Sequence, residues 1–423
     1  MRSSVARISL ALLIATAGGA FAPILTASSA SAASSGWVGE TILSSVAAGN
    51  GWEPAVAADP LAPYVYVAWM QYSGNKVRIA VRVSSDNGLS WGSPTALCTN
   101  CGGQGQYDVT LAVTSTGTVY ATFMEQYNIE FTKSTNHGLS WTPATTISGG
   151  VWADKPWMTT NANGDDIYVA WSTHGNIYTV DSHNAGVSWT TPLQVTMERQ
   201  IYYFPNGGTV LPNGTAVMVA SEYPENGNNT QRAGPIPIVE FRTMNGGRSW
   251  TRSVVDTVYA GATYATSSVT TVASDVNGTL VLVYSGSLAV GANGHVYVRR
   301  STDSGATWSA RAEMTTSAGG ADSTSVAAAG KGNGIFTLTW MDARTGAWNV
   351  WQRGSTDGGL SWSPDAKVSD ASSGASYKTA SGFGFPYGDY DMVALNSAGR
   401  TVAVMGEGDM SQINGDIWVN QQT

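Results

Sequence analysis

The sequence predicts an all-β protein, a seven-bladed β-propeller with four antiparallel strands in each blade. Three observations lead to this fold. An octapeptide with the pattern Ser/Thr-x-Asp/Asn-x-Gly-x-x-Trp occurs six times. Short segments of alternating apolar residues recur around every copy. Charged residues make up only 12% of the chain, whereas glycine (49) and tryptophan (16) are abundant, which is typical of many short strands and tight turns.

The six octapeptides begin at Ser84, Ser134, Ser182, Thr243, Ser301 and Ser355, and their tryptophans recur every 48 to 61 residues. That period fits one four-stranded unit per copy. We expect the Asp or Asn oxygen to accept backbone hydrogen bonds within a turn, and the glycine to adopt a positive φ. The tryptophan should begin the next strand and bury its ring. Because the Asp and Asn residues recur at turns, we assign them a structural role and exclude them from the candidate site.

The strands follow from the segments around the octapeptides. Two alternating apolar segments precede each copy, such as 64–69 and 77–81, and one short strand follows, such as 144–148. A further segment opens each unit, and there are seven such segments: 54–58, 109–113, 157–160, 208–211, 268–273, 325–329 and 392–395.

The chain ends explain why seven units carry six octapeptides. The last unit stops after its third strand, residues 416–420, and residues 37–44 match residues 141–148, which follow an octapeptide. We therefore expect the N-terminal strand to complete the last blade, close the ring and cover an exposed sheet edge. The alternative is a six-bladed ring, which would leave strands unpaired. The prediction is one domain over residues 33–423.

The N-terminal segment has the layout of a secretory signal peptide, residues 1–32. Arg2 and Arg7 precede an apolar run at 8–22, and small residues end it at Ala30-Ser31-Ala32. A membrane anchor is the alternative, but the run is short and interrupted. We expect a secreted, extracellular protein with no membrane span.

Cysteine content and charge narrow the environment and the partners. Cys98 and Cys101 are the two cysteines, and in an oxidising compartment they favour a small local disulfide over half a zinc site or a redox pair. The net charge of -8 disfavours nucleic acid and anionic membranes as partners. We expect a monomer.

The octapeptides resemble the Asp-boxes of the bacterial neuraminidase repeat superfamily, over nearly all of the mature chain. That superfamily includes sialidases, other glycoside hydrolases, polysaccharide lyases and non-catalytic proteins, so the resemblance implies a fold and leaves the reaction open. The sialidase pattern implies three arginines that hold the sialate carboxylate, a Tyr paired with a Glu, and an Asp acid. Tyr390 lies where such a Tyr would be. Where a sialidase has Arg-Ile-Pro, however, this chain has Trp52-Glu53-Pro54, which would repel a carboxylate ligand.

Antiparallel order places the starts of the first strands and the loops between second and third strands at one end of the ring, which we call the mouth face. The octapeptides lie at the other end, the octapeptide face. Carboxylates gather in the loops of the mouth face: Glu53, Asp108, Asp154, Asp322, Asp389 and Asp391. Such a group can raise the pKa values of its members, hold a structural Ca2+, or bond to backbone N–H groups of the neighbouring blade.

Aromatic and basic residues gather at the same end. The aromatic residues are Trp52, Tyr107, Trp152, Trp157, Tyr202, Tyr203, Tyr223, Tyr264, Trp348 and Tyr387. Together they could form a platform for sugar rings, or they could simply pack between sheets. The arginines are Arg199, Arg232 and Arg344, of which Arg344 is expected to form a loop salt bridge with Asp342. Arg232 lies in the longest insertion, 222–235, and long loops commonly carry binding residues.

These residues lead to the hypothesis of a glycoside hydrolase-like propeller that acts on extracellular carbohydrate. The candidate catalytic residues are Tyr390, Glu222, Asp154 and Asp389, and the candidate substrate-binding residues are Glu53, Trp52, Asp108, Arg199, Tyr223, Arg232, Arg344 and Trp348. The alternatives are a non-catalytic glycan-binding or surface-binding propeller and a purely structural envelope protein. The four histidines (His137, His174, His183 and His295) are poor candidates because no pair has metal-ligand spacing.

Overall fold

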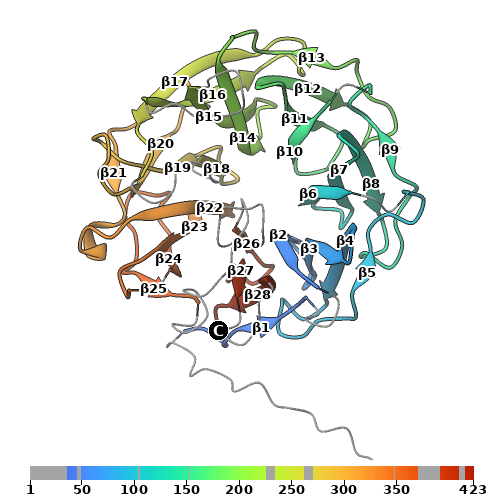
Figure 1. The fold of residues 1–423 in the computed structure, drawn as a ribbon, viewed down its shortest axis with the longest axis horizontal. Coiled ribbons are helices and arrows are strands. Elements are labelled where there is room, and N and C mark those ends of the chain that lie inside the picture. The colour runs from blue at the N-terminus through green and yellow to red at the C-terminus, as the bar shows by residue number, and fades with distance from the viewer. Residues whose placement is uncertain are drawn as a thin grey trace, which may run out of the picture. The chain divides into compact units, whose positions relative to one another are not determined.

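Seven four-stranded antiparallel sheets form the blades of a propeller (Figure 1). The structure is a computed structural model and describes residues 36–44, 49–102, 105–150, 152–224, 234–261, 270–346, 348–369, 391–408 and 415–423. In these ranges the helical structure is one short 3-10 turn, η2 (Thr316–Ala318). No helix within the same ranges has the length and hydrophobicity needed to cross a membrane. The predicted signal peptide lies outside the described residues.

Blades 1 to 4 follow one another along the chain, each from its innermost to its outermost strand. Blade 1 contains β2 (Gly51–Ala58), β3 (Val65–Ser73), β4 (Lys76–Ser84) and β5 (Thr95–Ala96). Blade 2 contains β6 (Gln106–Val113), β7 (Val119–Glu125), β8 (Asn128–Ser134) and β9 (Thr145–Thr146). Blade 3 contains β10 (Asp154–Thr160), β11 (Ile167–Thr173), β12 (Asn176–Ser182) and β13 (Leu193–Gln194). Blade 4 contains β14 (Ile201–Val210), β15 (Ala216–Pro224), β16 (Ile236–Thr243) and β17 (Thr251–Val258).

Blades 5 to 7 complete the ring. Blade 5 contains β18 (Thr270–Ser274), β19 (Leu280–Gly286), β20 (His295–Ser301) and β21 (Ala312–Glu313). Blade 6 contains β22 (Ser323–Lys331), β23 (Ile335–Asp342), β24 (Asn349–Ser355) and β25 (Ala366–Lys367). Blade 7 contains β26 (Met392–Leu395), β27 (Thr401–Gly408), β28 (Gly415–Gln421) and β1 (Thr41–Ile42).

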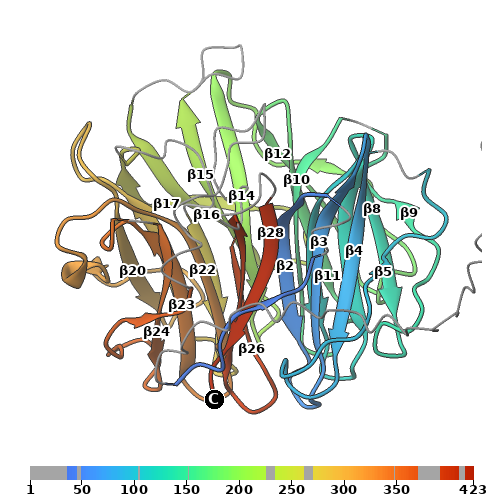
Figure 2. The same cartoon turned by 60° about the horizontal axis from the view of Figure 1, so that its bottom comes forward.

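The ring closes by the predicted exchange of chain ends. β1 pairs with β28, Thr41 opposite Val419, and Figure 2 shows β28 beside β2 of blade 1. The Ser44 hydroxyl accepts the N–H of Ile417 at 2.9 Å, as the equivalent Ser148 hydroxyl accepts that of Ile129 in blade 2. Each inner strand contacts the inner strands of both neighbouring blades, from β2 around to β26 and back. The seven-bladed prediction is confirmed, and the six-bladed alternative is wrong.

All six octapeptides form the same hydrogen-bonded turn. In the first copy the Ser84 hydroxyl donates to the Asp86 carboxylate at 2.7 Å and accepts the N–H of Gly88 at 2.8 Å. Asp86 in turn accepts the N–H of Ser90 at 2.8 Å. The glycine has a positive φ in every copy, as predicted, and the residue before it does too, for example Asn87 at 63°. The Asp or Asn therefore has the expected structural role.

The octapeptide tryptophans pack between blades rather than begin strands. In blades 1, 2, 3, 5 and 6 the fourth strand starts four residues after the tryptophan, and the predicted direct start holds only in blade 4, where β17 follows Trp250. Prolines in this stretch, such as Pro94 and Pro143, lack the N–H that a ladder requires. Each tryptophan lies against a separate hydrophobic cluster shared with the preceding blade: Trp91, Trp141, Trp189, Trp250, Trp308 and Trp362.

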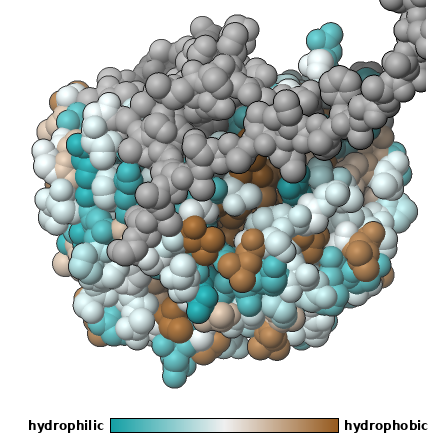
Figure 3. All heavy atoms as spheres, turned by 90° about the horizontal axis from the view of Figure 1, so that it is seen from below, coloured by the Kyte–Doolittle hydropathy of each residue, from teal (hydrophilic) through white to brown (hydrophobic). Residues whose placement is uncertain are grey.

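The face of the molecule coloured in Figure 3 has no continuous apolar band, because its apolar side chains lie apart from one another among polar ones.

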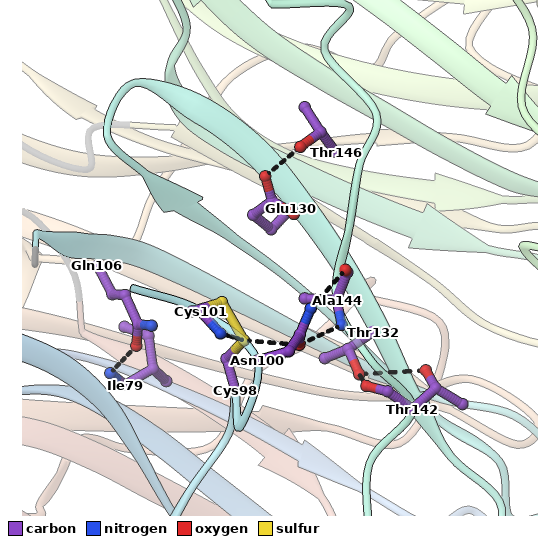
Figure 4. The surroundings of a disulfide bond; sticks show 10 residues. All are labelled: Ile79, Cys98, Asn100, Cys101, Gln106, Glu130, Thr132, Thr142, Ala144 and Thr146. Atoms are coloured by element: carbon purple, nitrogen blue, oxygen red, sulfur yellow. Dashed lines mark hydrogen bonds between the residues drawn. A yellow bond between two sulfur atoms is a disulfide. The ribbon is translucent and has the colours of Figure 1, made fainter. Parts of the chain in front are cut away.

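The predicted disulfide between Cys98 and Cys101 is present in the loop that joins blades 1 and 2. Within that loop Asn100 bonds to the backbone of Ala144 in blade 2, accepting its N–H at 2.8 Å and donating to its carbonyl at 3.1 Å (Figure 4). The disulfide loop therefore fastens one blade to the next.

Candidate functional site

Within the described part of the chain, five inner strands carry a two-residue β-bulge near their start at the mouth face. In each blade, two residues of the inner strand oppose a single residue of the second strand. We call these five pairs the bulge ring: Glu53–Pro54, Asp108–Val109, Lys155–Pro156, Asn206–Gly207 and Ser325–Val326. Four of the five bulges carry a charged or amide side chain, Glu53, Asp108, Lys155 or Asn206, and bulges commonly redirect side chains.

The bulge ring is conformationally strained. Glu53, Asp108, Lys155 and Ser325 have φ values of 52°, 49°, 53° and 50°, in the left-handed region that disfavours residues with a Cβ. Each such residue costs about 1 to 2 kcal/mol. In blade 4 the positive φ falls on Gly207 instead. Strain of this kind, repeated in four blades, is typical of sites that have a function beyond folding.

The described contacts of the bulge ring join neighbouring blades. The Lys155 ammonium lies 3.9 Å from the Asp108 carboxylate of blade 2 and 4.8 Å from the centre of the Phe204 ring of blade 4. Asn206 donates to the carbonyl of Thr270 in blade 5 at 2.9 Å. Glu53 is buried, with 3% of its surface exposed. Contacts with groups of neighbouring blades thus hold Asp108, Lys155 and Asn206.

Asp154 lies beside the bulge ring and remains partly exposed. It precedes Lys155 at the start of β10, and the hydroxyl of Tyr202 in blade 4 donates to its Oδ2 at 3.1 Å. Burial raises the pKa of Tyr202 well above its ordinary value; Asp154 adds to this increase and Lys155 opposes it. Tyr202 is therefore a neutral hydrogen-bond donor at physiological pH. Among the sequence candidates in the described residues, Asp154 is the carboxylate best placed to meet a ligand.

An aromatic pair lines blade 1 next to these charges. The rings of Trp52 and Tyr72 lie 5.0 Å apart and are tilted by 58°. Burial raises the pKa of Tyr72, and Glu53, Tyr107 and Asp108 raise it further, so these groups lie close together. Trp52 is largely buried, whereas Tyr72 is partly exposed.

A second aromatic group continues along blades 2 and 3. Tyr127, Trp152 and His174 stack in sequence, with ring centres separated by 5.6 and 5.2 Å. Tyr127 and His174 lie in the tight turns β7–β8 and β11–β12, and Trp152 lies just before β10. Tyr107 directly precedes Asp108 of the bulge ring; burial raises its pKa, and Tyr127 and Asp108 add to this increase. We define the aromatic arc as Trp52, Tyr72, Tyr107, Tyr127, Trp152, His174 and Tyr202.

Glu222 has a different environment from Asp154. It is buried, with 6% of its surface exposed, and it accepts the Nε–H of Arg252 at 2.6 Å. It also bonds to the hydroxyl of Tyr203, whose pKa is raised by burial and by the Glu222 charge. Glu222 therefore belongs to an internal Arg–Glu–Tyr group of blade 4.

The predicted pair of Asp342 and Arg344 forms the expected salt bridge. Arg344 Nη2 donates to Asp342 Oδ2 at 2.6 Å, and Arg344 also pairs with Asp365. Its guanidinium lies 3.9 Å from the centre of the Trp351 ring. Several groups of the protein thus hold Arg344.

The remaining candidates are spread over the mouth face. Tyr223 is buried, Trp348 packs partly into a hydrophobic cluster, and Arg199 is exposed and forms no ion pair within the described residues. Asp322 accepts the N–H of Gly294 in blade 5. Asp391 is buried at the start of β26. Tyr390, Asp389 and Arg232, together with Tyr264 and Tyr387, lie outside the described residues.

The described residues contain no group of three or more His, Cys, Asp or Glu side chains that could hold a metal ion. The contacts of Asp108, Asp154 and Asp322 instead run to a lysine, a tyrosine and a backbone N–H. Bonding to the neighbouring blade was one of the three roles that the sequence left open for these carboxylates.

Sequence reasoning missed Lys155, Tyr127 and His174. Lys155-Pro156 repeats the pattern of Glu53-Pro54 at the same place in its unit, so an alignment of the inner strands could have found it. No sequence signal distinguishes Tyr127 or His174, because their importance depends on turns that bring them against Trp152.

No protein-family model matches the sequence, and no curated protein matches it. Solved structures do match it. The chain is similar to an ulvan lyase, a polysaccharide lyase crystallised with a GlcA–Rha3S saccharide, at 10% identity and a TM-score of 0.53, over 88% of this chain and 94% of that one. It is also similar to a protein of unknown function from Dyadobacter fermentans, at 12% identity and a TM-score of 0.52, over 91% and 98% of the two chains. A Hadza microbial sialidase matches at 12% identity and a TM-score of 0.47, over 85% and 76%. The first two similarities concern the fold, which in this chain is a β-propeller.

Proposed function

We propose that this chain is an extracellular glycan-acting propeller of the Asp-box type, with its site on the mouth face of blades 1 to 4. The observation that carries the proposal is the partly exposed Asp154–Tyr202 pair, in which Asp154 directly precedes Lys155 of the strained bulge ring and Tyr202 belongs to the aromatic arc. Sugar rings have apolar faces that stack on aromatic rings, and their hydroxyls require acceptors and donors. The exposed and partly exposed members of the arc, together with Asp154, provide these complementary groups on the mouth face.

In this proposal Asp154 accepts a hydrogen bond from a sugar hydroxyl or acts as the acid or base. Tyr202 donates a hydrogen bond to Asp154. A glycoside hydrolase needs a second acidic or nucleophilic group near the first. Asp389 and Tyr390 are the sequence candidates for that group, while Glu222 keeps a structural role because Arg252 and Tyr203 hold it.

Non-catalytic binding is the second candidate function. The specific observation that favours it is that Glu53 and Asp108 are buried in the bulge ring, so they do not add free carboxyl groups beside Asp154. A binding protein needs the aromatic arc and one polar centre, and both are present.

The test is incubation of the purified mature chain with sialylated, neutral and uronate-containing glycans, followed by mass spectrometry of released products and of glycans retained on immobilised protein. For an enzyme, Asp154→Asn should lower the rate of release by about 100-fold or more. For a binding protein, Asp154→Asn and Tyr202→Phe should each weaken retention by about 10-fold, the effect of one charge-assisted hydrogen bond. Tyr64→Phe, on the octapeptide face, is the control and should change neither readout. A chain that releases and retains nothing from the panel would contradict the proposal.

A further inference from the structure

The three-ring stack of Tyr127, Trp152 and His174 stands at the edge of the proposed site. Tyr127 has 55% of its surface exposed, and His174 is exposed as well. The N–H of Ala153 donates to the carbonyl of Tyr127 at 2.8 Å, which fastens the Tyr127 turn to the segment that leads into Asp154. The stack is therefore held in position relative to the polar centre.

The ring geometry leaves aromatic surface available to a ligand. Rings in face-to-face contact are separated by about 3.5 to 4 Å. The centres of Trp152 and His174 lie 5.2 Å apart with planes inclined by only 12°, and those of Tyr127 and Trp152 lie 5.6 Å apart at 25°. Near-parallel rings at these distances must be offset, so each ring leaves part of a face uncovered. The three rings therefore form a stack in which each ring is displaced sideways from the next.

The turns that carry Tyr127 and His174 have backbone conformations that are unfavourable for these residues. Gln126 and Tyr127 are the two loop residues between Glu125 and Asn128, with φ values of 50° and 65°, and His174 precedes Gly175 with a φ of 47°. Two-residue hairpin loops with positive φ favour Asn-Gly or Asp-Gly, and a Tyr or His there costs about 1 to 2 kcal/mol. The sequence therefore places aromatic rings where folding alone favours Asn or Gly.

We infer that Tyr127, Trp152 and His174 form an outer subsite that contacts the successive sugar units of a glycan chain. This inference rests on the proposed function and narrows it, because a subsite beside the Asp154 centre is useful only to a ligand longer than the centre alone can hold. The substrate class is thus an oligosaccharide or polysaccharide chain rather than a single terminal sugar. The stacking surface selects for exposed apolar sugar faces.

The test compares ligands of two lengths with variants that suit the turns better than the native residues do. His174→Asn creates an Asn-Gly loop and Tyr127→Asn places Asn at a left-handed position, so both variants should fold and keep or raise the melting temperature. The probes are two-unit and six-unit oligosaccharides from whichever of xylan, cellulose, arabinan or pectin the native chain retains. Each variant should weaken six-unit binding by about 5- to 10-fold, since it removes one stacking contact, and leave two-unit binding unchanged.

His137→Asn is the matched control. His137 also has a left-handed φ, 57°, precedes a glycine and stacks on a tyrosine, Tyr64, but it lies on the octapeptide face. It should change binding of neither length. If His174→Asn and Tyr127→Asn bind the six-unit probe as tightly as the native chain, or lose both lengths equally, the outer subsite is overturned while the proposed function stands. If the native chain binds neither length of any of the four glycans, the subsite is overturned, and the proposed function fails as well only if the release and retention panel described above is also negative.

Discussion

Single residues show where this sequence follows local rules and where it departs from them. The octapeptide glycines could be predicted because a turn with positive φ favours glycine, and all six have one. The left-handed Glu53 and Lys155 could not, because both precede proline, and that position favours extended backbone. Their conformation comes from the bulges, which only the pairing of β2 and β10 with their neighbours defines.

Asp391 gives a prediction of pH-dependent stability. Burial raises the pKa of its carboxyl to about 7, and a backbone N–H at Gly406 offsets this only in part. A carboxyl whose folded pKa exceeds its unfolded pKa contributes stability below the unfolded value, and that contribution is lost as the pH rises through the folded value. Asp391→Asn should therefore gain free energy of unfolding over the native chain as the pH rises. This gain should be about 2 kcal/mol larger at pH 8 than at pH 5.

Urea unfolding at the two pH values measures this effect. Glu240 is a second buried carboxyl with a pKa raised by burial to about 7, so part of the pH dependence should persist in Asp391→Asn and decrease further when Glu240→Gln is added. Equal pH dependence in the native chain and the double variant would refute the assignment.

At the scale of elements, the octapeptide turn serves the blade before it as much as its own. Its tryptophan packs against a cluster shared with that blade. Its glycine also approaches a residue of the preceding blade: a Cβ on Gly305 would lie 2.2 Å from Glu240 Oε1 of blade 4, and one on Gly247 the same distance from Asp181 Oδ1 of blade 3. The glycine is thus required for close approach as well as for φ.

Gly305→Ala should therefore destabilise the fold more than its φ alone requires. Gly214 is a matched control, because its φ of 83° is nearly that of Gly305, 82°, and a Cβ there would meet nothing within 4 Å. Gly214→Ala should lower the free energy of unfolding by about 1 kcal/mol, the usual penalty of a Cβ at positive φ. Gly305→Ala should lower it by at least about 2 kcal/mol more, because the Glu240 carboxylate must move within the contact between blades 4 and 5. Chemical denaturation of both variants provides the measurement, and equal losses would show that this contact accommodates the methyl group.

For the whole molecule, the N-terminal segment supplies the fourth strand of blade 7, a serine hydroxyl bond and a buried tryptophan. β1 is its fourth strand, Ser44 repeats the hydroxyl bond of other blades, and Trp37, only 3% exposed, lies in a hydrophobic cluster as the octapeptide tryptophans do. At the octapeptide face, Lys331 of blade 6 donates to the carbonyls of Pro60 in blade 1 and Asn396 in blade 7. Two separate sets of contacts therefore join the first and last blades.

A chain that begins at Gly49 should consequently be less stable than one that begins at Gly36. Without residues 36–44, β28 has an unpaired edge and the cluster around Trp37 is opened to water. We expect a fall in melting temperature of about 10 °C or more and a tendency to aggregate. Scanning calorimetry of the two chains tests this, and identical transitions would mean that β1 is dispensable.

The fold was predictable from the sequence to a greater extent than the site. The repeated octapeptides predict the blades, and the match of residues 37–44 to residues 141–148 predicts how the N-terminal strand closes the ring. Side-chain direction has no such signal. Asp154 and Glu222 look alike in the sequence, yet one meets Tyr202 near the surface and the other is enclosed by Arg252 and Tyr203. The stack on Trp152 likewise depends on two turns that only the assembled ring brings together.

The central claim is that glycan binds the mouth face of blades 1 to 4, and hydrogen–deuterium exchange tests it most directly. The mature chain would be compared with and without a saturating amount of the glycan it retains. The account predicts slower exchange at the start of β10, at the turns 125–128 and 173–176, and at the start of β14, with no change in the octapeptide turns. Protection confined to the octapeptide face, or to blades 5 and 6, would contradict it.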